Sequence, residues 1–258
     1  MTSPSSQSAA ADPELSLVIP CYNEEACLPL TLPPLVDAFR HAGVPLELVL
    51  VDNGSHDATS AVIDDLISKG LPVVKGTVPD NQGQGLGFLT GIRLARGRFI
   101  GWICADGQVR SEDVLAIFES LRDAPAPAMA KARRRYRQDS WLRKINSIVY
   151  NALFQVLFLG IRSLDINGNP KIFPADVLRQ MELQSIDWFL EAEAMLKADY
   201  LRLPIIEMDV IGLSRADGHS HVRLSAVLEF IKNMLVYRLG TPWRTWRLTA
   251  SQHRSNTQ

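Results

Sequence analysis

The 258-residue sequence has few cysteines and lacks a long apolar run. Its three cysteines, Cys21, Cys27 and Cys104, stand at no spacing typical of a zinc site. Their odd number argues against a disulfide framework, so we expect a reducing compartment. No apolar stretch reaches the roughly 20 residues that a membrane-spanning helix needs. We therefore expect that the chain does not cross a membrane.

An excess of charge of either sign is also lacking. The chain has 27 basic and 28 acidic residues, and a net charge of −1 gives no general affinity for nucleic acid. The basic residues are nevertheless unevenly placed: residues 131–144 (KARRRYRQDSWLRK) hold seven of them beside one acid. After Glu229 come five more and no acid. Local basic patches on a neutral protein favour an anionic small ligand or surface over nucleic acid.

Two common nucleotide-binding signatures are missing. A dinucleotide-binding fold needs a glycine-rich turn after its first strand, and here that turn reads CYNEE. The later GQGLG opens a helix, but it has the wrong spacing and follows the third predicted strand. No GxxxxGK sequence is present, which excludes a P-loop.

Apolar runs and helical periods alternate along the first half of the chain. Four β-rich runs predict buried strands at residues 14–21, 46–53, 71–78 and 98–106. Helices are expected after Asn23 (interrupted near Pro33 and Pro34), at 57–69, at 83–96 and, capped by Ser111, at 111–123. This alternation predicts an α/β fold with a mostly parallel central sheet flanked by helices. Beyond about residue 128 we expect a basic loop, a helix near 140–160 and a strand at PKIF.

Polar residues follow three of the predicted strands. These strand ends are residues 20–24, 52–55 and 105–108. Each alone is consistent with a turn or a helix cap. Because parallel strands bring their carboxyl ends to one edge, where ligands bind in such folds, the three together favour a binding site.

These segments, in this order, resemble the family 2 glycosyltransferases with a GT-A fold: IPCYNEE, VDNGSHDAT, NQGQG followed by Gly91, and ADGQ. Within that family the chain is most similar to the dolichyl- and polyprenyl-phosphate sugar synthases. The similarity continues through KARRRYRQD, DINGNPKIF, EAE and SRADGHSHV, and so covers about residues 15 to 223. It implies a metal-dependent, inverting transfer of a hexose from a GDP- or UDP-sugar to polyprenyl phosphate.

We expect three regions: a disordered tail (1–13), a GT-A domain (14–223), and a C-terminal amphipathic helix with a basic tail (224–258). Within the domain, residues 14–125 would form the nucleotide-sugar half. Residues 126–223 would form a less regular acceptor half.

The resemblance implies donor-side roles residue by residue. Asp106 and Gln108 match the last acid and the glutamine of the family's DADxQ pattern and would hold Mg²⁺ or Mn²⁺ on the donor's diphosphate. Cys104 replaces the first acid, and a neutral thiol is a poor ligand for these hard ions, so the metal site would be intact but weaker. The residues expected to contact the base, ribose or sugar are Pro20, Tyr22, Glu24, Asp52, Ser55 and Glu191.

The basic segment suits an acceptor phosphate. A lipid phosphate is already anionic at neutral pH, so it needs positioning by cations rather than a general base, and arginine presents a planar fork of donors. Arg143 and Ser147 are four residues apart on a predicted helix and could contact one phosphate. Family similarity adds three arginines to this site: Arg134, Arg137 and Arg215. Arg133 is interchangeable with Arg134, because the alignment of the triple arginine can shift by one residue. We assign catalytic roles to Asp106, Arg134, Arg143 and Arg215.

Apolar stripes at helical spacing lie in residues 145–157 and 224–239, and Trp243 and Trp246 follow among arginines. Such faces suit helices in a membrane interface, although either could instead pack on the protein's own core. We expect peripheral contact with the inner, cytoplasmic face of a membrane.

Two other functions remain open. The same fold could transfer sugar to a hydroxyl of a soluble or polysaccharide acceptor, which predicts an essential carboxylate base. Alternatively, the protein could bind nucleotide sugars without catalysis, and Cys104 is the best support for that reading.

Overall fold

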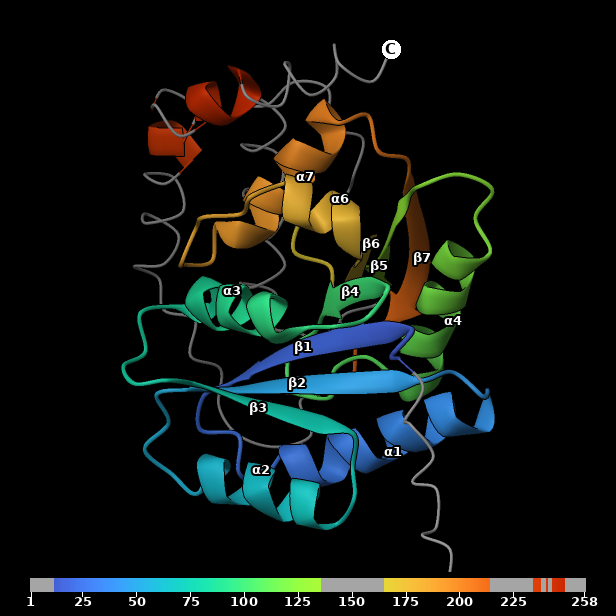
Figure 1. The fold of residues 1–258 in the computed structure, drawn as a ribbon, viewed down its shortest axis with the longest axis vertical. Helices are drawn as coiled ribbons and strands as arrows, with labels where there is room; N and C mark the ends of the chain where they lie inside the picture. Colours follow the sequence, from blue (N-terminus) through green and yellow to red (C-terminus); the bar gives the residue numbers. More distant parts are fainter. Residues whose placement is uncertain (1–11, 136–164, 214–233, 238–239, 241–242, 249–258) are drawn as a thin grey trace, which may run out of the picture.

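The computed structural model describes residues 12–135, 165–213, 234–237, 240 and 243–248. Within these residues seven strands form one sheet, in the order β3-β2-β1-β4-β6-β5-β7 (Figure 1). The strands are β1 (Leu15–Cys21), β2 (Leu46–Asn53), β3 (Val73–Val78), β4 (Phe99–Trp102), β5 (Met129–Arg135), β6 (Lys171–Pro174) and β7 (Ile205–Ile211). The helices with assigned bounds are α1 (Leu28–His41), α2 (Thr59–Ser68), α3 (Gln84–Leu94), α4 (Ser111–Arg122), α6 (Ala175–Gln180) and α7 (Leu190–Tyr200).

The sheet is mostly parallel, as predicted. Strand β1 pairs in parallel with β2 and β4, β2 with β3, and β5 with β7, whereas β6 is antiparallel to both β4 and β5. The predicted α/β class is confirmed. Strands of the second half of the chain complete the sheet that the first half begins.

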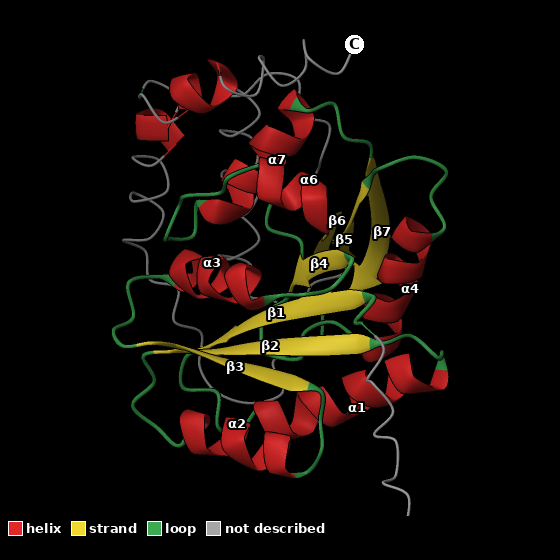
Figure 2. Ribbon diagram, in the orientation of Figure 1, coloured by secondary structure: helices red, strands yellow, loops and turns green. Residues whose placement is uncertain are grey.

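Helices cover both faces of the sheet (Figures 1 and 2). Alternate residues of β1 show why. Leu17 and Ile19 belong to the apolar cluster shared with α1, α2 and α4, while Val18 belongs to the cluster shared with α3, α6 and α7. Because successive side chains of a strand point to opposite faces, one apolar run serves both layers.

Helix α3 lies unusually close to the sheet because glycines form its contact face. A Cβ on Gly91 would come 2.2 Å from Val18 Cγ1, and one on Gly87 would come 2.7 Å from Pro20 Cβ. This approach places the first turn of α3 beside the carboxyl ends of β1 and β2.

Helix α1 is continuous through Pro33 and Pro34, so the predicted interruption was wrong. A proline removes the hydrogen bond to the carbonyl four residues earlier. Here those carbonyls belong to Pro29 and Leu30, which are exposed, so water can solvate them.

The predicted strand at 98–106 is shorter in the structure. It ends at Trp102, and only the backbone N–H of Ile103, which donates to Val18 O at 3.1 Å, continues the pairing. Ser111 is the first residue of α4 rather than its cap, a position held by Arg110, which forms an ion pair with Asp113.

The predicted basic loop is strand β5 over residues 131–135. Acids on β7 explain this difference, because Lys131 lies opposite Glu207 and Arg133 opposite Asp209, and both pairs form ion pairs. Opposite charges across neighbouring strands stabilise the pairing that a run of cations alone would oppose.

Trp243 and Trp246 are buried, contrary to the membrane contact expected for them. They are 8% and 5% exposed and pack edge-on against Tyr200 of α7, with ring centroids 5.8 and 5.4 Å away. Trp246 also donates its indole N–H to Gln180 O at 3.5 Å. Of the two predicted amphipathic helices, at 145–157 and 224–239, only residues 234–237 are among those that the structure describes. Among the described helices, none combines the length and apolar character needed to cross a membrane.

The fit of α3 predicts that Gly91→Ala is destabilising. The added methyl would meet Val18 in a packed core, and overpacking of this kind costs about 1–3 kcal/mol of unfolding free energy. Urea denaturation measures the loss. Arg93→Ala, an exposed site on the same helix, is the control and should change stability by less than about 0.5 kcal/mol. Equal losses in the two variants would contradict the packing described here.

Candidate functional site

The loops after β1 and β2 are joined by hydrogen bonds. The backbone N–H of Asn23 donates to Ser55 Oγ at 3.1 Å, and that of Glu24 donates to Thr59 Oγ1 at 2.8 Å. In return, the N–H of His56 donates to Asn23 Oδ1 at 2.8 Å. These hydrogen bonds hold together the residues of the two loops that are predicted to bind the nucleotide sugar.

Asp52 and Tyr22 belong to the same edge. Asp52 is 7% exposed and accepts the backbone N–H of Ser55 at 3.0 Å. Tyr22 is half-buried and packs edge-on against His56, with ring centroids 6.3 Å apart. Gly54 adopts a positive φ of 74°, and a Cβ there would come 2.6 Å from the backbone nitrogen of Asn81, so the loop after β3 closes on the same edge.

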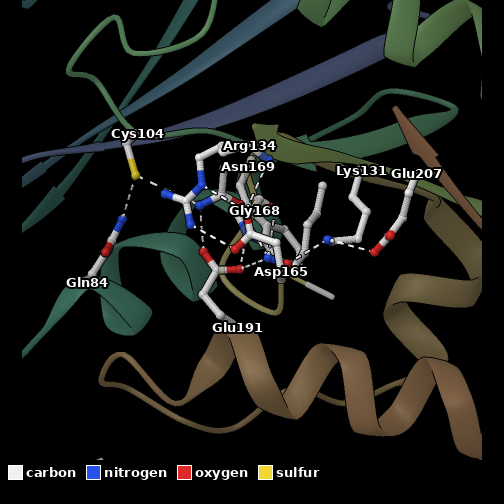
Figure 3. Close-up of polar contacts among 11 residues, drawn as sticks. Gln84, Cys104, Lys131, Arg134, Asp165, Gly168, Asn169, Glu191 and Glu207 are labelled. Atoms are coloured by element: carbon white, nitrogen blue, oxygen red, sulfur yellow. Dashed lines mark hydrogen bonds and ion pairs between the residues drawn. The ribbon is translucent and has the colours of Figure 1, made fainter. Parts of the chain in front are cut away.

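The segment after β4 carries Cys104, Asp106 and Gln108. Burial raises the pKa of the Cys104 thiol to about 12, and the nearby Asp106 and Glu191 add to the shift, so the thiol is neutral. Gln84 Nε2 donates to the Cys104 sulfur at 3.3 Å (Figure 3). A neutral, hydrogen-bonded thiol agrees with the sequence interpretation that Cys104 is not a metal ligand.

Asp106 and Gln108 lie on one turn, with Gly107 between them at a φ of 67°. Asp106 Oδ1 accepts the backbone N–H of Gln108 at 3.3 Å, and Gln108 Nε2 donates to Leu213 O at 3.2 Å. Among the described residues there is no group of three acids, histidines or cysteines arranged to hold a metal. One carboxylate and one amide oxygen still fit Mg²⁺ or Mn²⁺, provided that substrate phosphates and water complete the coordination.

Arg134 is half-buried near Cys104 and is paired with Asp165 (Figure 3). Its Nε and Nη2 each donate to one carboxylate oxygen at 3.0 Å, and its backbone N–H donates at 3.2 Å. Burial would raise the pKa of Asp165, yet Arg134 holds it well below its usual range. Arg133 instead pairs with Asp209, so the two arginines that the sequence left interchangeable have different environments.

Glu191 is buried near Cys104 and is held by three donors. Its carboxylate accepts Trp102 Nε1 at 3.1 Å and Asn169 Nδ2 at 2.8 Å, and it forms an ion pair with Lys171 (Figure 3). Asn169 Nδ2 also lies 3.9 Å from the Cys104 sulfur. The contact of Glu191 with sugar hydroxyls stays a prediction.

The sequence interpretation missed three buried polar residues around Arg134 and Glu191, and a fourth that is half-buried: Lys131, Asp165 and Lys171, and Asn169. Lys131 and Lys171 are 0% exposed and lie opposite each other on β5 and β6. Burial and the neighbouring Lys171 lower the pKa of Lys131 to about 8, although Glu207 opposes the shift. The signal available in the sequence was a lysine beside apolar residues, Lys131 between two alanines and Lys171 before Ile172, since lysine is rarely buried unless paired.

The remaining predicted acceptor residues, Arg137, Arg143, Ser147 and Arg215, lie outside the described residues. The structure thus brings together Pro20, Tyr22, Glu24, Asp52 and Ser55 in one group of joined loops. A second group around Cys104 contains Asp106, Gln108, Arg134 and Glu191. Their roles in binding and catalysis remain predictions.

The family assignment follows from comparison. Residues 16–179 match the family model described as Glycosyl transferase family 2. The chain belongs to this family. The match spans β1 to α6, and therefore both groups of site residues except Glu191.

Known relatives agree with this assignment. The chain is 35% identical over 235 residues to an undecaprenyl-phosphate 4-deoxy-4-formamido-L-arabinose transferase of Shewanella sediminis, covering 89% of this chain and 68% of that protein. It is 28% identical over 255 residues to a dolichyl-phosphate beta-glucosyltransferase of Homo sapiens, covering 91% and 78% respectively. The predicted similarity to polyprenyl-phosphate sugar transferases is confirmed.

The fold is also similar to that of a solved structure, glucosyl-3-phosphoglycerate synthase from Mycobacterium tuberculosis in complex with Mn²⁺, UDP-glucose and phosphoglyceric acid. The TM-score is 0.68 at 19% identity, covering 90% of this chain and 82% of the other. This likeness confirms the predicted GT-A fold and concerns the fold alone.

The Arg134–Asp165 pair predicts a pH-dependent effect of Asp165→Asn. Breaking a buried ion pair from one side costs about 3–5 kcal/mol of unfolding free energy at pH 7. Because the folded pKa of Asp165 lies below its unfolded value near 3.8, the difference from wild type is fully present above that value. It should shrink as the pH falls toward 2, as measured by urea denaturation at several pH values.

Asp209→Asn is the matched control, because Asp209 pairs with the adjacent Arg133 but is 39% exposed. We expect a much smaller loss with little pH dependence. If Asp165→Asn is no worse than this control, the pair does not carry the stability assigned to it.

Proposed function

We propose that this protein is an inverting glycosyltransferase that moves a hexose from a GDP- or UDP-sugar to polyprenyl phosphate. The observation that carries the proposal is the convergence of the β1, β2 and β4 strand ends at one edge of the sheet, in a chain related to enzymes named for polyprenyl-phosphate acceptors. Ligands of open α/β sheets bind at such an edge. Inversion follows from a single displacement by the acceptor, with no carboxylate nucleophile required.

The donor would bind along the joined loops. Pro20, Tyr22 and Glu24 would contact the base and ribose, with Asp52 and Ser55 beside them. Asp106 and Gln108 would hold a divalent cation on the diphosphate. When bound, that ion would stabilise the negative charge that develops on the leaving nucleoside diphosphate.

Glu191, which is buried near Cys104, would hold sugar hydroxyls. Trp102, Asn169 and Lys171 keep its carboxylate oriented for that contact. All three groups point hydrogen-bond donors at the Glu191 carboxylate, so this side chain is placed as an acceptor.

The state of two buried carboxylates favours a phosphate acceptor over a hydroxyl. A hydroxyl needs a general base whose pKa lies near the working pH. Asp165 has a lowered pKa and is bound to Arg134, and Glu191 is bound to Lys171. The lowered pKa makes Asp165 a poor base, and the Glu191 oxygens are already occupied by three donors. An anionic lipid phosphate does not require a base.

Arg134 would contribute hydrogen-bond donors to the acceptor phosphate, since two of its five N–H groups are used on Asp165. Arg137, Arg143, Ser147 and Arg215 complete the proposed acceptor site. A lipid acceptor implies work at a membrane surface, and we propose peripheral attachment at its cytoplasmic face.

Transfer of radiolabelled sugar into organic-extractable lipid tests this function. GDP- and UDP-sugars are offered with polyprenyl phosphate and Mn²⁺ or Mg²⁺. Labelled lipid that is lost in Asp106→Ala and Arg143→Ala supports the proposal. Donor hydrolysis without labelled lipid would point to a hydroxyl acceptor, and donor binding without turnover to a non-catalytic protein.

Cys104→Asp should tighten metal binding. The substitution adds a second carboxylate two residues from Asp106, and hard cations prefer such ligands over a thiol. We expect the Mn²⁺ concentration for half-maximal transfer to fall about tenfold, equivalent to about 1.4 kcal/mol. Cys104→Ser, which stays neutral, is the control. Identical metal dependence in the two variants would place the metal away from this turn.

A further inference from the structure

Glu193, two residues after Glu191, lies in a separate polar cluster. It is 1% exposed, and its carboxylate receives four donor groups. The backbone N–H groups of Gln184 and Ser185 donate at 3.1 and 2.8 Å, Lys197 forms an ion pair at 2.7 Å, and the Tyr237 hydroxyl lies at 3.5 Å. A buried carboxylate with these partners fixes the backbone of residues 184–185.

Residues 185–187 are in turn pressed against the first turn of α3. The backbone N–H of Leu86 donates to Ile186 O at 2.8 Å. A Cβ on Gly83 would come 2.6 Å from Ile186 O, and one on Gly85 would come 2.5 Å from the carbonyl oxygens of Ser185 and Asp187. Only glycine permits this contact, so the two backbones are closely interlocked.

The first turn of α3 contacts the part of the site that is proposed to bind the nucleotide sugar. Gln84 donates to the Cys104 sulfur at 3.3 Å, and Gly83 O accepts Asn53 Nδ2 at 3.0 Å. Figure 3 shows Gln84 reaching Cys104 from α3, on the other side of that residue from Arg134. A shift of residues 83–84 would therefore displace their hydrogen-bond partners, Cys104 and Asn53 at the end of β2.

We propose that Glu193 is a positioning residue for donor binding. By holding residues 184–187 on the first turn of α3, it fixes Gln84 against the turn that carries Asp106. This inference rests on the proposed function, because it assumes that the donor's diphosphate binds at that turn. Glu193 acts through other residues and touches no reacting atom.

The C-terminal segment shares the same anchor. Lys197 donates to Glu182 O at 2.9 Å, and its ammonium lies 4.9 Å from the centre of the Trp246 ring. Tyr237 packs against Phe189 with ring centroids 4.8 Å apart. The described part of the C-terminus therefore closes the apolar side of the cluster and keeps water from Glu193.

The test compares steady-state kinetics of Glu193→Gln with those of Glu47→Gln. Glu47 is a matched control: it is 3% exposed and accepts Ser16 Oγ at 2.6 Å and the backbone N–H of Arg96 at 3.0 Å, but it lies at the amino ends of β1 and β2. For Glu193→Gln we expect the donor KM to rise about tenfold, with kcat and the acceptor KM within twofold of wild type. For Glu47→Gln we expect an unchanged donor KM despite a loss of stability.

Gly85→Ala provides a second route to the same contact, since its methyl would push residues 185–187 away from α3. It should raise the donor KM as Glu193→Gln does. A wild-type donor KM in Glu193→Gln, or parallel changes in Glu193→Gln and Glu47→Gln, would overturn the proposal.

Calorimetric titration with GDP and UDP in the presence of Mn²⁺ separates this proposal from the proposed function. If wild type transfers no sugar to polyprenyl phosphate, the proposed function fails, yet nucleotide affinity still decides the role of Glu193. Weaker binding in Glu193→Gln alone supports it. Equal affinities in Glu193→Gln and wild type, or no binding of either nucleotide to wild type, overturn it.

Discussion

Parallel pairing of β1 with both β2 and β4 is the constraint on which the rest of the structure depends. It aligns Cys21 with Asp52 and carries Trp102 alongside Val18, so three polar strand ends emerge on one edge. The loops then bond to one another instead of to solvent, as the contacts between Asn23 and the His56 backbone show. A site built on backbone register is rigid before any ligand arrives, which limits the entropy lost on binding.

Burial of charge shapes the other half of the site. Around Arg134 the structure places three cations, Lys131, Arg134 and Lys171, and three acids, Asp165, Glu191 and Glu207. Buried ions are costly unless paired and hydrogen-bonded. Each acid here pairs with one cation, so this cluster supplies oriented donors and acceptors with little net charge. The positive charge that an incoming phosphate needs would then come from the metal and from the other basic residues of residues 131–144.

The sequence predicted strands β1, β2, β3, β4 and β6, most of them from apolar runs with polar ends. It predicted a loop at β5 and no strand at β7. It failed where pairing with a distant segment decides the outcome. The cations of β5 form a strand because acids on β7, 76 residues later, lie opposite them. The sequence placed Trp246 at a membrane, whereas in the fold it packs against Tyr200 and donates to Gln180 O.

The same limit applies to the site residues. The resemblance to family motifs indicated Asp106, Gln108 and Glu191, because those motifs are read from short local segments. Lys171 and Asn169 were not recognised, since their contacts with Glu191 of α7 come from the start of β6 and from the loop before it. For Glu193 the sequence indicated only that, two residues from Glu191 on a helix, its side chain points in a different direction. Its partner backbone at residues 184–185 is fixed only by the fold.

A crystal structure with GDP or UDP and Mn²⁺, with the metal located by its anomalous signal, tests the central claim most directly. We expect Mn²⁺ to be held by Asp106 and Gln108 together with the diphosphate of the nucleotide. The base and ribose should lie against Tyr22 and Asp52. A nucleotide bound elsewhere, or a metal coordinated without Asp106, would contradict the account.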